Sequence, residues 1–191
     1  RKVFYGKVAV GGGAPVSIQS MSTFPASSRG EVLGQIEALG RAGCEIVRVS
    51  VRDPEDARAI GDLVAESSLP VIADVHFDHR LAVESARWGA AGLRINPGNI
   101  GGEEKVVAVI EAASAAGIPV RIGINSGSLE KDLARAFPND PAAAMCESAS
   151  RALEIFDRAG FRDVVVSLKS SDPGVTVRAN ELFAPESDVP L

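Results

Sequence analysis

The sequence predicts an α/β fold, specifically a TIM-type (β/α)8 barrel. Strand-like and helix-like segments alternate along the chain, and Gly or Pro separates many of them. This alternation implies parallel strands joined by right-handed crossovers. Five of the strand-like segments are apolar on one face and polar or charged on the other, because strand side chains alternate with a period of two. A barrel whose interior is lined by polar, ligand-binding residues explains both the alternation of elements and the strands with one polar face.

A doubly wound sheet is the first alternative, because it shows the same alternation of strands and helices. That fold usually places a glycine-rich phosphate-binding turn after its first strand, and its central strands are apolar on both faces. Here Gly11-Gly12-Gly13 comes before the first strand of the repeat. These glycines are therefore interpreted as a turn, and the barrel remains the prediction.

The expected elements follow one another in a regular order. A hairpin over residues 3–10, turning near Gly6, opens the chain. Strands are expected at residues 17–21, 47–51, 72–76, 93–96, 120–125 and 166–169. Helices are expected near residues 29–42, 54–67, 78–88, 103–116, 141–159 and 173–184. Residues 126–139 are expected to form a long loop.

Local signals mark the ends of these helices. Asp followed by Pro can cap a helix and occupy its first position, and such pairs stand at 53–54, 140–141 and 172–173. Asp78 is expected to cap a further helix, with His79 as a surface residue. Glycine ends several helices, at Gly43, Gly117 and Gly160.

Six βα units follow the hairpin, whereas a complete barrel of this type has eight strands. An open remnant would expose two strand edges. The chain begins at Arg1 rather than Met, and its last residues, 188–191, look like a loop entering a strand. We therefore expect residues 1–191 to be an incomplete N-terminal substrate-binding barrel domain from a longer protein.

Bulk composition argues against several classes of function. The net charge is −5 and the sequence pI is about 5.1, so binding to nucleic acid or a membrane surface through overall charge is not expected. No segment reaches the roughly 20 apolar residues of a membrane span, and none has the layout of a signal peptide. Cys44 and Cys146 are too few for a disulfide framework. We expect them to be small core residues of a cytoplasmic protein.

The polar strand faces contain the candidate site. Their residues are Gln19, then Arg48 with Ser50, Asp74 with His76, Arg94 with Asn96, Arg121 with Asn125, and Ser167 with Lys169. Burying several cations together is costly unless an anion joins them. Arg contacts phosphate through two parallel hydrogen bonds, and Lys supplies a mobile charge. The pattern predicts a phosphate-bearing ligand inside the barrel. A Schiff base on Lys169 is a weaker alternative.

The remaining polar positions leave several interpretations open. Asp74 and His76 lie on one strand face and suit ligand hydrogen bonding, proton transfer or a structural network. A metal site would need further ligands that no recognisable spacing supplies. Residues 96–99 and 125–128 are either plain turns or ligand-binding loops at strand ends, and residues 170–172 are a helix cap or part of the site. No catalytic triad or carboxylate pair is present in the sequence pattern.

These motifs resemble a known family. The matching segments are Gln19-Ser20-Met21, Ile46–Val51, Ala73–Asp78, Leu93-Arg94-Ile95-Asn96-Pro97-Gly98-Asn99-Ile100-Gly101, Arg121–Asp132 and Ser167–Asp172. In order and almost without gaps, they resemble the 4-hydroxy-3-methylbut-2-enyl diphosphate synthase family of the methylerythritol phosphate route to isoprenoids. The blocks at residues 93–99 and 127–132 are the most specific.

The resemblance implies reductive opening of 2-C-methyl-D-erythritol 2,4-cyclodiphosphate. Electrons would come from flavodoxin or ferredoxin through a 4Fe-4S cluster, in a bacterial cytoplasmic homodimer. It also assigns roles by position: Arg48, Arg94, Arg121 and Lys169 as a diphosphate clamp, with Asn96 and Asn125 as supporting donors. Asp74 and His76 match a family motif and are added as binding candidates with their roles open.

The chain lacks the cluster ligands and the catalytic glutamate that the family pattern includes. The family binds its cluster through three cysteines and a glutamate in a C-terminal domain, and neither Cys44 nor Cys146 matches those positions. The family's catalytic glutamate is expected beyond Leu191, so no catalytic or metal-binding residue is assigned here. The runner-up is a pterin-binding barrel of the dihydropteroate synthase type. A third possibility is a non-catalytic phosphate-binding half-barrel that assembles with another chain.

Overall fold

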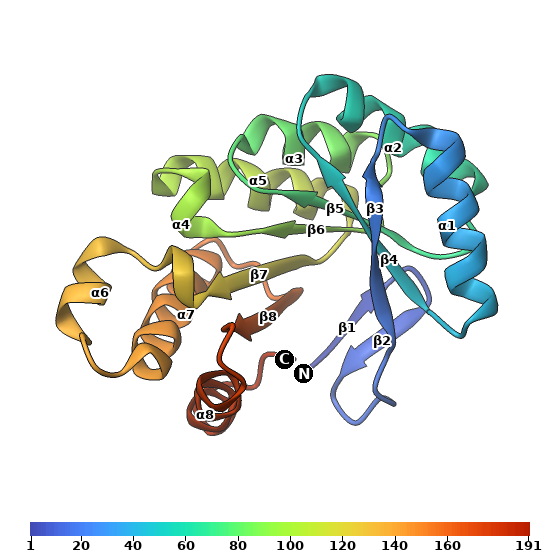
Figure 1. The fold of residues 1–191 in the computed structure, drawn as a ribbon. Coiled ribbons are helices and arrows are strands. Elements are labelled where there is room, and N and C mark those ends of the chain that lie inside the picture. Colours follow the sequence, from blue (N-terminus) through green and yellow to red (C-terminus); the bar gives the residue numbers. More distant parts are fainter.

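The computed structural model describes all residues from 1 to 191 and contains a hairpin followed by one six-stranded parallel sheet (Figure 1). The hairpin pairs β1 (Lys2–Tyr5) with β2 (Val8–Gly11) in antiparallel register. The sheet strands are β3 (Gln19–Pro25), β4 (Ile46–Val51), β5 (Val71–Val75), β6 (Gly92–Ile95), β7 (Val120–Asn125) and β8 (Val164–Lys169). They lie in sequence order, each parallel to the next, which confirms the predicted α/β alternation.

A helix follows each strand of the sheet. The helices are α1 (Arg29–Arg41), α2 (Pro54–Glu66), α3 (His79–Arg87), α4 (Pro97–Ile100), α5 (Glu103–Ala116), α6 (Lys131–Ala136), α7 (Pro141–Arg158) and α8 (Pro173–Phe183), with short 3-10 turns η1 (Ser126–Ser128) and η2 (Ala184–Glu186). Asp53, Asp140 and Asp172 accept backbone N–H groups at the starts of α2, α7 and α8, as predicted. Asp78 caps α3 in the same way.

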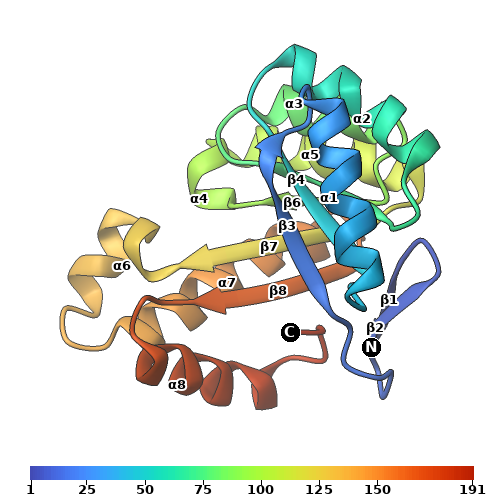
Figure 2. The same cartoon turned by 45° about the vertical axis from the view of Figure 1, so that its right-hand side comes forward.

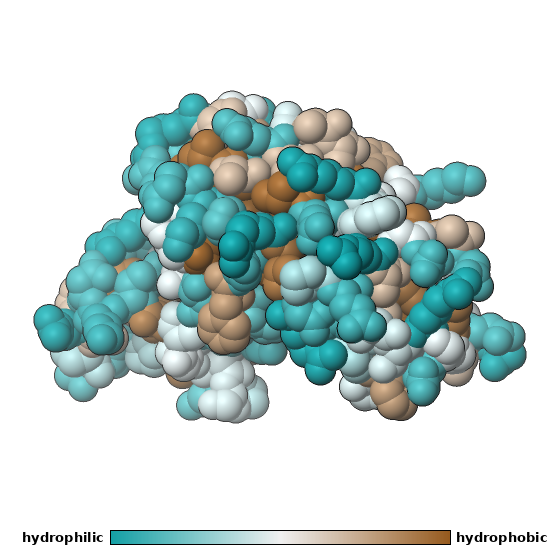
Figure 3. Space-filling model, turned by 90° about the horizontal axis from the view of Figure 1, so that it is seen from above, coloured by the Kyte–Doolittle hydropathy of each residue, from teal (hydrophilic) through white to brown (hydrophobic).

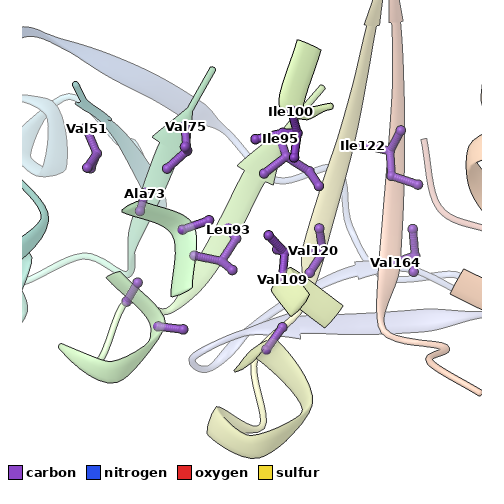
Figure 4. Packing of buried hydrophobic residues seen from close by; sticks show 14 of the residues in the cluster. Val51, Ala73, Val75, Leu93, Ile95, Ile100, Val109, Val120, Ile122 and Val164 are labelled. Carbon is purple, nitrogen blue, oxygen red and sulfur yellow. The ribbon is translucent and has the colours of Figure 1, made fainter. Parts of the chain in front are cut away.

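The longer helices cover the outer side of the curved sheet, and the hairpin lies at the end of the sheet where the strands begin (Figures 1 and 2). The outward strand residues and the helix faces form one core cluster of 38 buried residues. Figure 4 shows Leu93, Val120 and Val164 of neighbouring strands within this cluster. Seen from above, the helix-covered side is mostly hydrophilic, with apolar residues in patches between polar ones (Figure 3).

The structure corrects three local predictions. The first sheet strand runs over Gln19–Pro25, later than residues 17–21. Residues 126–139 are not one long loop, because they contain η1 and α6. Residues 97–100 form the short helix α4 rather than a plain turn, because Asn96 accepts the N–H of Gly98 and so caps a helical turn.

The sheet is open, since β3 and β8 lie at opposite edges and do not pair. The last residues run beside β8, where the N–H of Val166 donates to the carbonyl oxygen of Pro190 at 2.9 Å. Both chain ends lie together (Figure 1), and the Arg1 side chain pairs with Asp188. No helix is long and apolar enough to cross a membrane.

Candidate anion-binding site

Asp74 is the centre of a charged group on the inner face of the sheet. It lies on β5, is 1% exposed, and stands in register with Ser50 of β4 and Arg94 of β6. Its Oδ2 lies 2.9 Å from Nε of Arg48, and its Oδ1 accepts from Nη1 of Arg94 at 3.3 Å. One buried carboxylate therefore holds two guanidinium groups side by side.

Arg121 brings a third guanidinium into this group without a carboxylate of its own. It lies on β7 in register with Arg94. Its Nη1 donates to the neutral Oε1 of Gln19 at 3.1 Å, and its Nε is buried with no partner. Burial lowers the pKa of Arg121 below its ordinary value, and Arg94 adds to this, while Tyr5 and Asp74 oppose it. Because Arg stays protonated in proteins, the site keeps an excess of positive charge.

Arg48 has the same character at the edge of the group. Its side chain is 20% exposed, and its Nε, although close to Asp74, makes no well-aligned hydrogen bond. Burial lowers the pKa of Arg48, an effect that Asp74 opposes and that Arg94 and Arg121 reinforce. Mutual repulsion among desolvated guanidinium groups is the condition that a bound anion relieves.

Gly123 lies next to the side chain of Arg94 on the inner face of the sheet. It occupies the inward position of β7 that follows Arg121. A Cβ atom placed at Gly123 would overlap the guanidinium group of Arg94. The lack of a side chain therefore leaves the space that Arg94 occupies. A lone glycine inside a strand is a sequence signal of close approach, so Gly123 could have been predicted as part of the site.

His76 and Lys169 lie at the rim of the site. His76 comes just after β5, is about half exposed, and its Nδ1 lies 3.4 Å from Nη1 of Arg94. Its Nε2 lies 3.6 Å from Oδ1 of Asp74. Lys169 ends β8 in register with Asn125 and is exposed, unlike the buried cation that its strand position predicted. It makes no ion pair, so it is free to reach a ligand from the rim.

The two candidate asparagines have different surroundings. Asn96 is 2% exposed and is used by the fold: its Oδ1 caps α4 and its Nδ2 donates to Ser128 Oγ at 3.0 Å. The side chain of Asn125 makes no hydrogen bond within the chain, and its backbone oxygen accepts from Ser128. Asn125 is therefore the better placed ligand donor, and Asn96 supports the loop beside it.

The residues of this chain do not fit a 4Fe-4S cluster. Cys44 is 7% exposed and its thiol is directed to the backbone oxygens of Ile18 and Ile46. Cys146 lies on α7 against Ala179, and burial raises the pKa of its thiol, which disfavours the thiolate that iron needs. No group of three or more His, Cys, Asp or Glu residues is arranged to hold a metal ion.

The chain is similar in sequence to known proteins along its whole length. The family model for the GcpE TIM-barrel domain matches residues 1–191. A curated relative from Desulfotalea psychrophila, named 4-hydroxy-3-methylbut-2-en-1-yl diphosphate synthase (flavodoxin), is 46% identical over all of this chain and 53% of its own length. A relative of the same name from Aquifex aeolicus is 48% identical over 54% of its length. The chain thus spans about half the length of the curated relatives it matches.

Among solved structures, a dihydropteroate synthase from Xanthomonas albilineans aligns with 97% of this chain and 73% of its own, with a TM-score of 0.62 and 13% identity. A Yersinia pestis dihydropteroate synthase aligns with a TM-score of 0.56 at 14% identity. At such low identity these likenesses concern the barrel fold alone. The sequence relatives and the family model agree with the resemblance found from the motifs. The chain therefore belongs to the GcpE TIM-barrel domain family.

Proposed function

We propose that this chain is the substrate-binding barrel domain of a 4-hydroxy-3-methylbut-2-enyl diphosphate synthase. Such an enzyme uses two electrons to open 2-C-methyl-D-erythritol 2,4-cyclodiphosphate, giving 4-hydroxy-3-methylbut-2-enyl diphosphate and water. The observation that carries the proposal is the excess of guanidinium groups around Asp74, above all the buried Arg121 without an acidic partner. A cyclic diphosphate supplies the anionic oxygens that this group lacks.

The roles within the site follow from the contacts. Arg121 has no acidic partner, and Arg48 lies at the edge of the group with its side chain 20% exposed, so these two arginines bind the diphosphate oxygens most directly. Asp74 holds Arg48 and Arg94 in place. Lys169 and Asn125 close over the ligand from the ends of β8 and β7. His76 lies at the rim, where it donates a hydrogen bond or moves a proton near the organic part of the substrate.

Redox chemistry is the contribution of groups outside these residues. The family's 4Fe-4S cluster supplies electrons when bound, and we propose that a further domain of the whole protein holds it. The names of the relatives support flavodoxin as electron donor, with ferredoxin as the alternative. We propose a homodimer in the bacterial cytoplasm as the working form. The part played by this chain is to bind and orient the diphosphate in a partly desolvated site, where charge-assisted hydrogen bonds are strong.

The test is calorimetric titration of the full-length protein with 2-C-methyl-D-erythritol 2,4-cyclodiphosphate. The variant Arg121→Met keeps the volume of the side chain and removes its charge. Affinity should fall by about 1.5–3 kcal/mol, the usual cost of losing a charge-assisted hydrogen bond. The free energy of unfolding should stay equal or rise, because a buried cation without a carboxylate is costly. Arg48→Ala and Arg94→Ala should also weaken binding.

Arg58→Met is the matched control, since Arg58 is an exposed arginine on α2, on the outer side of the sheet. Its affinity should equal that of the unchanged protein. If Arg48, Arg94 and Arg121 variants all bind the cyclic diphosphate as tightly as the control does, the proposed clamp is wrong.

A pterin-binding transferase is the second candidate, and only the likeness of fold favours it. The same titration separates the two. A pterin carrying a diphosphate should bind more weakly than the cyclic diphosphate, because the polar side chains around Asp74 match phosphate groups and the ring of Tyr5 is buried. Tight binding of the pterin, with weak binding of the cyclic diphosphate, would favour the transferase. A non-catalytic phosphate-binding half-barrel that assembles with another chain is distinguished by size-exclusion chromatography with and without a separate C-terminal chain.

A further inference from the structure

The N-terminal hairpin lies at the end of the sheet where the strands begin (Figure 1). Val3 and Tyr5 of β1 are 1% and 2% exposed. They form a small apolar cluster with Ile46, Ile72 and Val165, which are the lowest inward residues of β4, β5 and β8. The hairpin therefore closes the floor of the same interior in which the guanidinium groups lie.

Tyr5 supplies the one aromatic ring among the five buried residues of this cluster. Its ring lies over Gly92, the first residue of β6, where any Cβ atom would overlap the ring. Gly92 is the inward position just below Arg94, whose neighbour in register is Arg121. On the other side, Val165 of the same apolar cluster stands in register with Arg121. Tyr5 thus lies against β6 below Arg94 and shares a cluster with Val165, the register neighbour of Arg121 on β8.

Tyr5 and Arg121 each have a buried polar group that makes no hydrogen bond. The hydroxyl oxygen of Tyr5 and the Nε–H group of Arg121 are both buried and both lack a hydrogen-bond partner. A hydroxyl oxygen accepts and a guanidinium N–H donates, so the two can satisfy one another. Buried polar groups are rarely left without a partner. Their electrostatic coupling appears in the pKa of Tyr5, which burial raises and Arg121 lowers.

We propose that Tyr5 is a positioning residue for Arg121: its hydroxyl oxygen accepts the Nε–H of Arg121, directly or through one bridging water, and so aims the terminal N–H groups at the diphosphate. The inference rests on the proposed function and assigns the hairpin a task within it. The hairpin is then both the plug of the barrel and the lower support of the anion site. A water bridge would be nearly as favourable as a direct bond.

The test is Tyr5→Phe in the full-length protein, titrated with 2-C-methyl-D-erythritol 2,4-cyclodiphosphate. The variant keeps the ring and removes only the hydroxyl group. Affinity should fall about five- to tenfold, the factor expected for about one hydrogen bond. The melting temperature should fall only slightly, because one buried hydrogen bond is lost while the packing of the ring over Gly92 is unchanged.

A double-mutant cycle measures the coupling between Tyr5 and Arg121 in ligand affinity, which a role in packing alone would not produce. In the Arg121→Met background, Tyr5→Phe should cost no further affinity. In the Arg48→Ala background it should keep its full factor. Val3→Ala is the matched control, since it removes packing but no polar atom from the same plug. It should lower the melting temperature and leave the affinity unchanged.

Two results would overturn the inference. One is that Tyr5→Phe keeps its affinity for the cyclic diphosphate while Arg121→Met loses affinity. Tyr5 would then only fill the floor of the barrel, and the proposed function would still hold. The other is an equal loss in Val3→Ala, which would assign the effect to packing. Failure of the proposed function itself looks different, because Arg121→Met would then bind the cyclic diphosphate as well as the unchanged protein does.

Discussion

The two faces of the six-stranded sheet are built in opposite ways. On the outer face, residues such as Leu93 and Ile122 join a single apolar cluster of 38 residues under the helices. On the inner face, the apolar cluster has only five residues and is confined to the floor. Above it lie Asp74 and the guanidinium groups around it. Along each strand, apolar side chains that stabilise the fold thus alternate with polar side chains that are available to bind a ligand.

This separation has an energetic meaning. Burial of apolar surface on the outer face stabilises the fold by about 25 cal/mol per Å² removed from water. The inner face contributes little of this kind, and it holds desolvated like charges that oppose folding until an anion joins them. Changes on the outer face should therefore affect stability alone, whereas changes on the inner face should affect stability and anion affinity together.

The largest effect is expected for Asp74→Asn, which leaves the guanidinium groups without their shared carboxylate. Removing one partner of a buried ion pair typically costs about 3–5 kcal/mol. The free energy of unfolding, measured with urea and circular dichroism, should fall by that order. Added pyrophosphate should restore part of the loss, because it binds the folded state.

Ser50→Ala is the control for this change, since Ser50 is the register neighbour of Asp74 on β4. Its stability should stay within about 0.5 kcal/mol of the unchanged protein. Equal stability of Asp74→Asn and Ser50→Ala would mean that the carboxylate does not organise the site.

Leu93→Ala tests the outer face of the neighbouring strand. Leu93 is 0% exposed and lies in the large core cluster (Figure 4). The free energy of unfolding should fall by about 2–5 kcal/mol, the range for a buried leucine replaced by alanine. Affinity for the cyclic diphosphate, measured where the variant is folded, should not change. A loss of affinity in this variant would contradict the proposed division between the two faces.

Gly123→Ala should lower stability less than Asp74→Asn or Leu93→Ala. The added methyl group displaces the guanidinium of Arg94, whose flexible side chain can shift, so the cost to stability should be about 1 kcal/mol, near the lower end for overpacking. Affinity for the cyclic diphosphate should nevertheless fall, because Arg94 no longer lies where Asp74 holds it. The matched variant is Gly127→Ala, since a Cβ atom at Gly127 meets nothing within 4 Å. If Gly123→Ala binds the cyclic diphosphate as tightly as the unchanged protein does, Arg94 is not part of the diphosphate clamp.

Much of the fold could be predicted because its signals are local. The strand over Val120–Asn125 and the helix over Glu103–Ala116 agree with the predicted ranges. The Asp-Pro pairs and terminal glycines mark helix ends through contacts within a few residues, as the cap at Asp53 illustrates. The inward face was also predictable, because alternation along Arg48 and Ser50 needs no knowledge of the neighbouring strand.

Other features were missed because they depend on long-range contacts. The hairpin was expected, but nothing near Tyr5 in the sequence indicates that its ring lies over Gly92. The pairing of Arg121 with Gln19 joins residues 102 positions apart. The exposure of Lys169 follows from its position at the end of β8, where the inner face opens to solvent.

The alternating strands and helices, the polar inner face and the family can all be recognised from the residues alone, because they depend on local periodicity and contiguous motifs. Three features required the folded chain: which cation lacks a carboxylate, which glycine leaves room for Arg94, and which residues close the floor of the site. They could not be predicted because charge balance and steric fit on the inner face depend on the register between strands, which packing across the whole sheet sets.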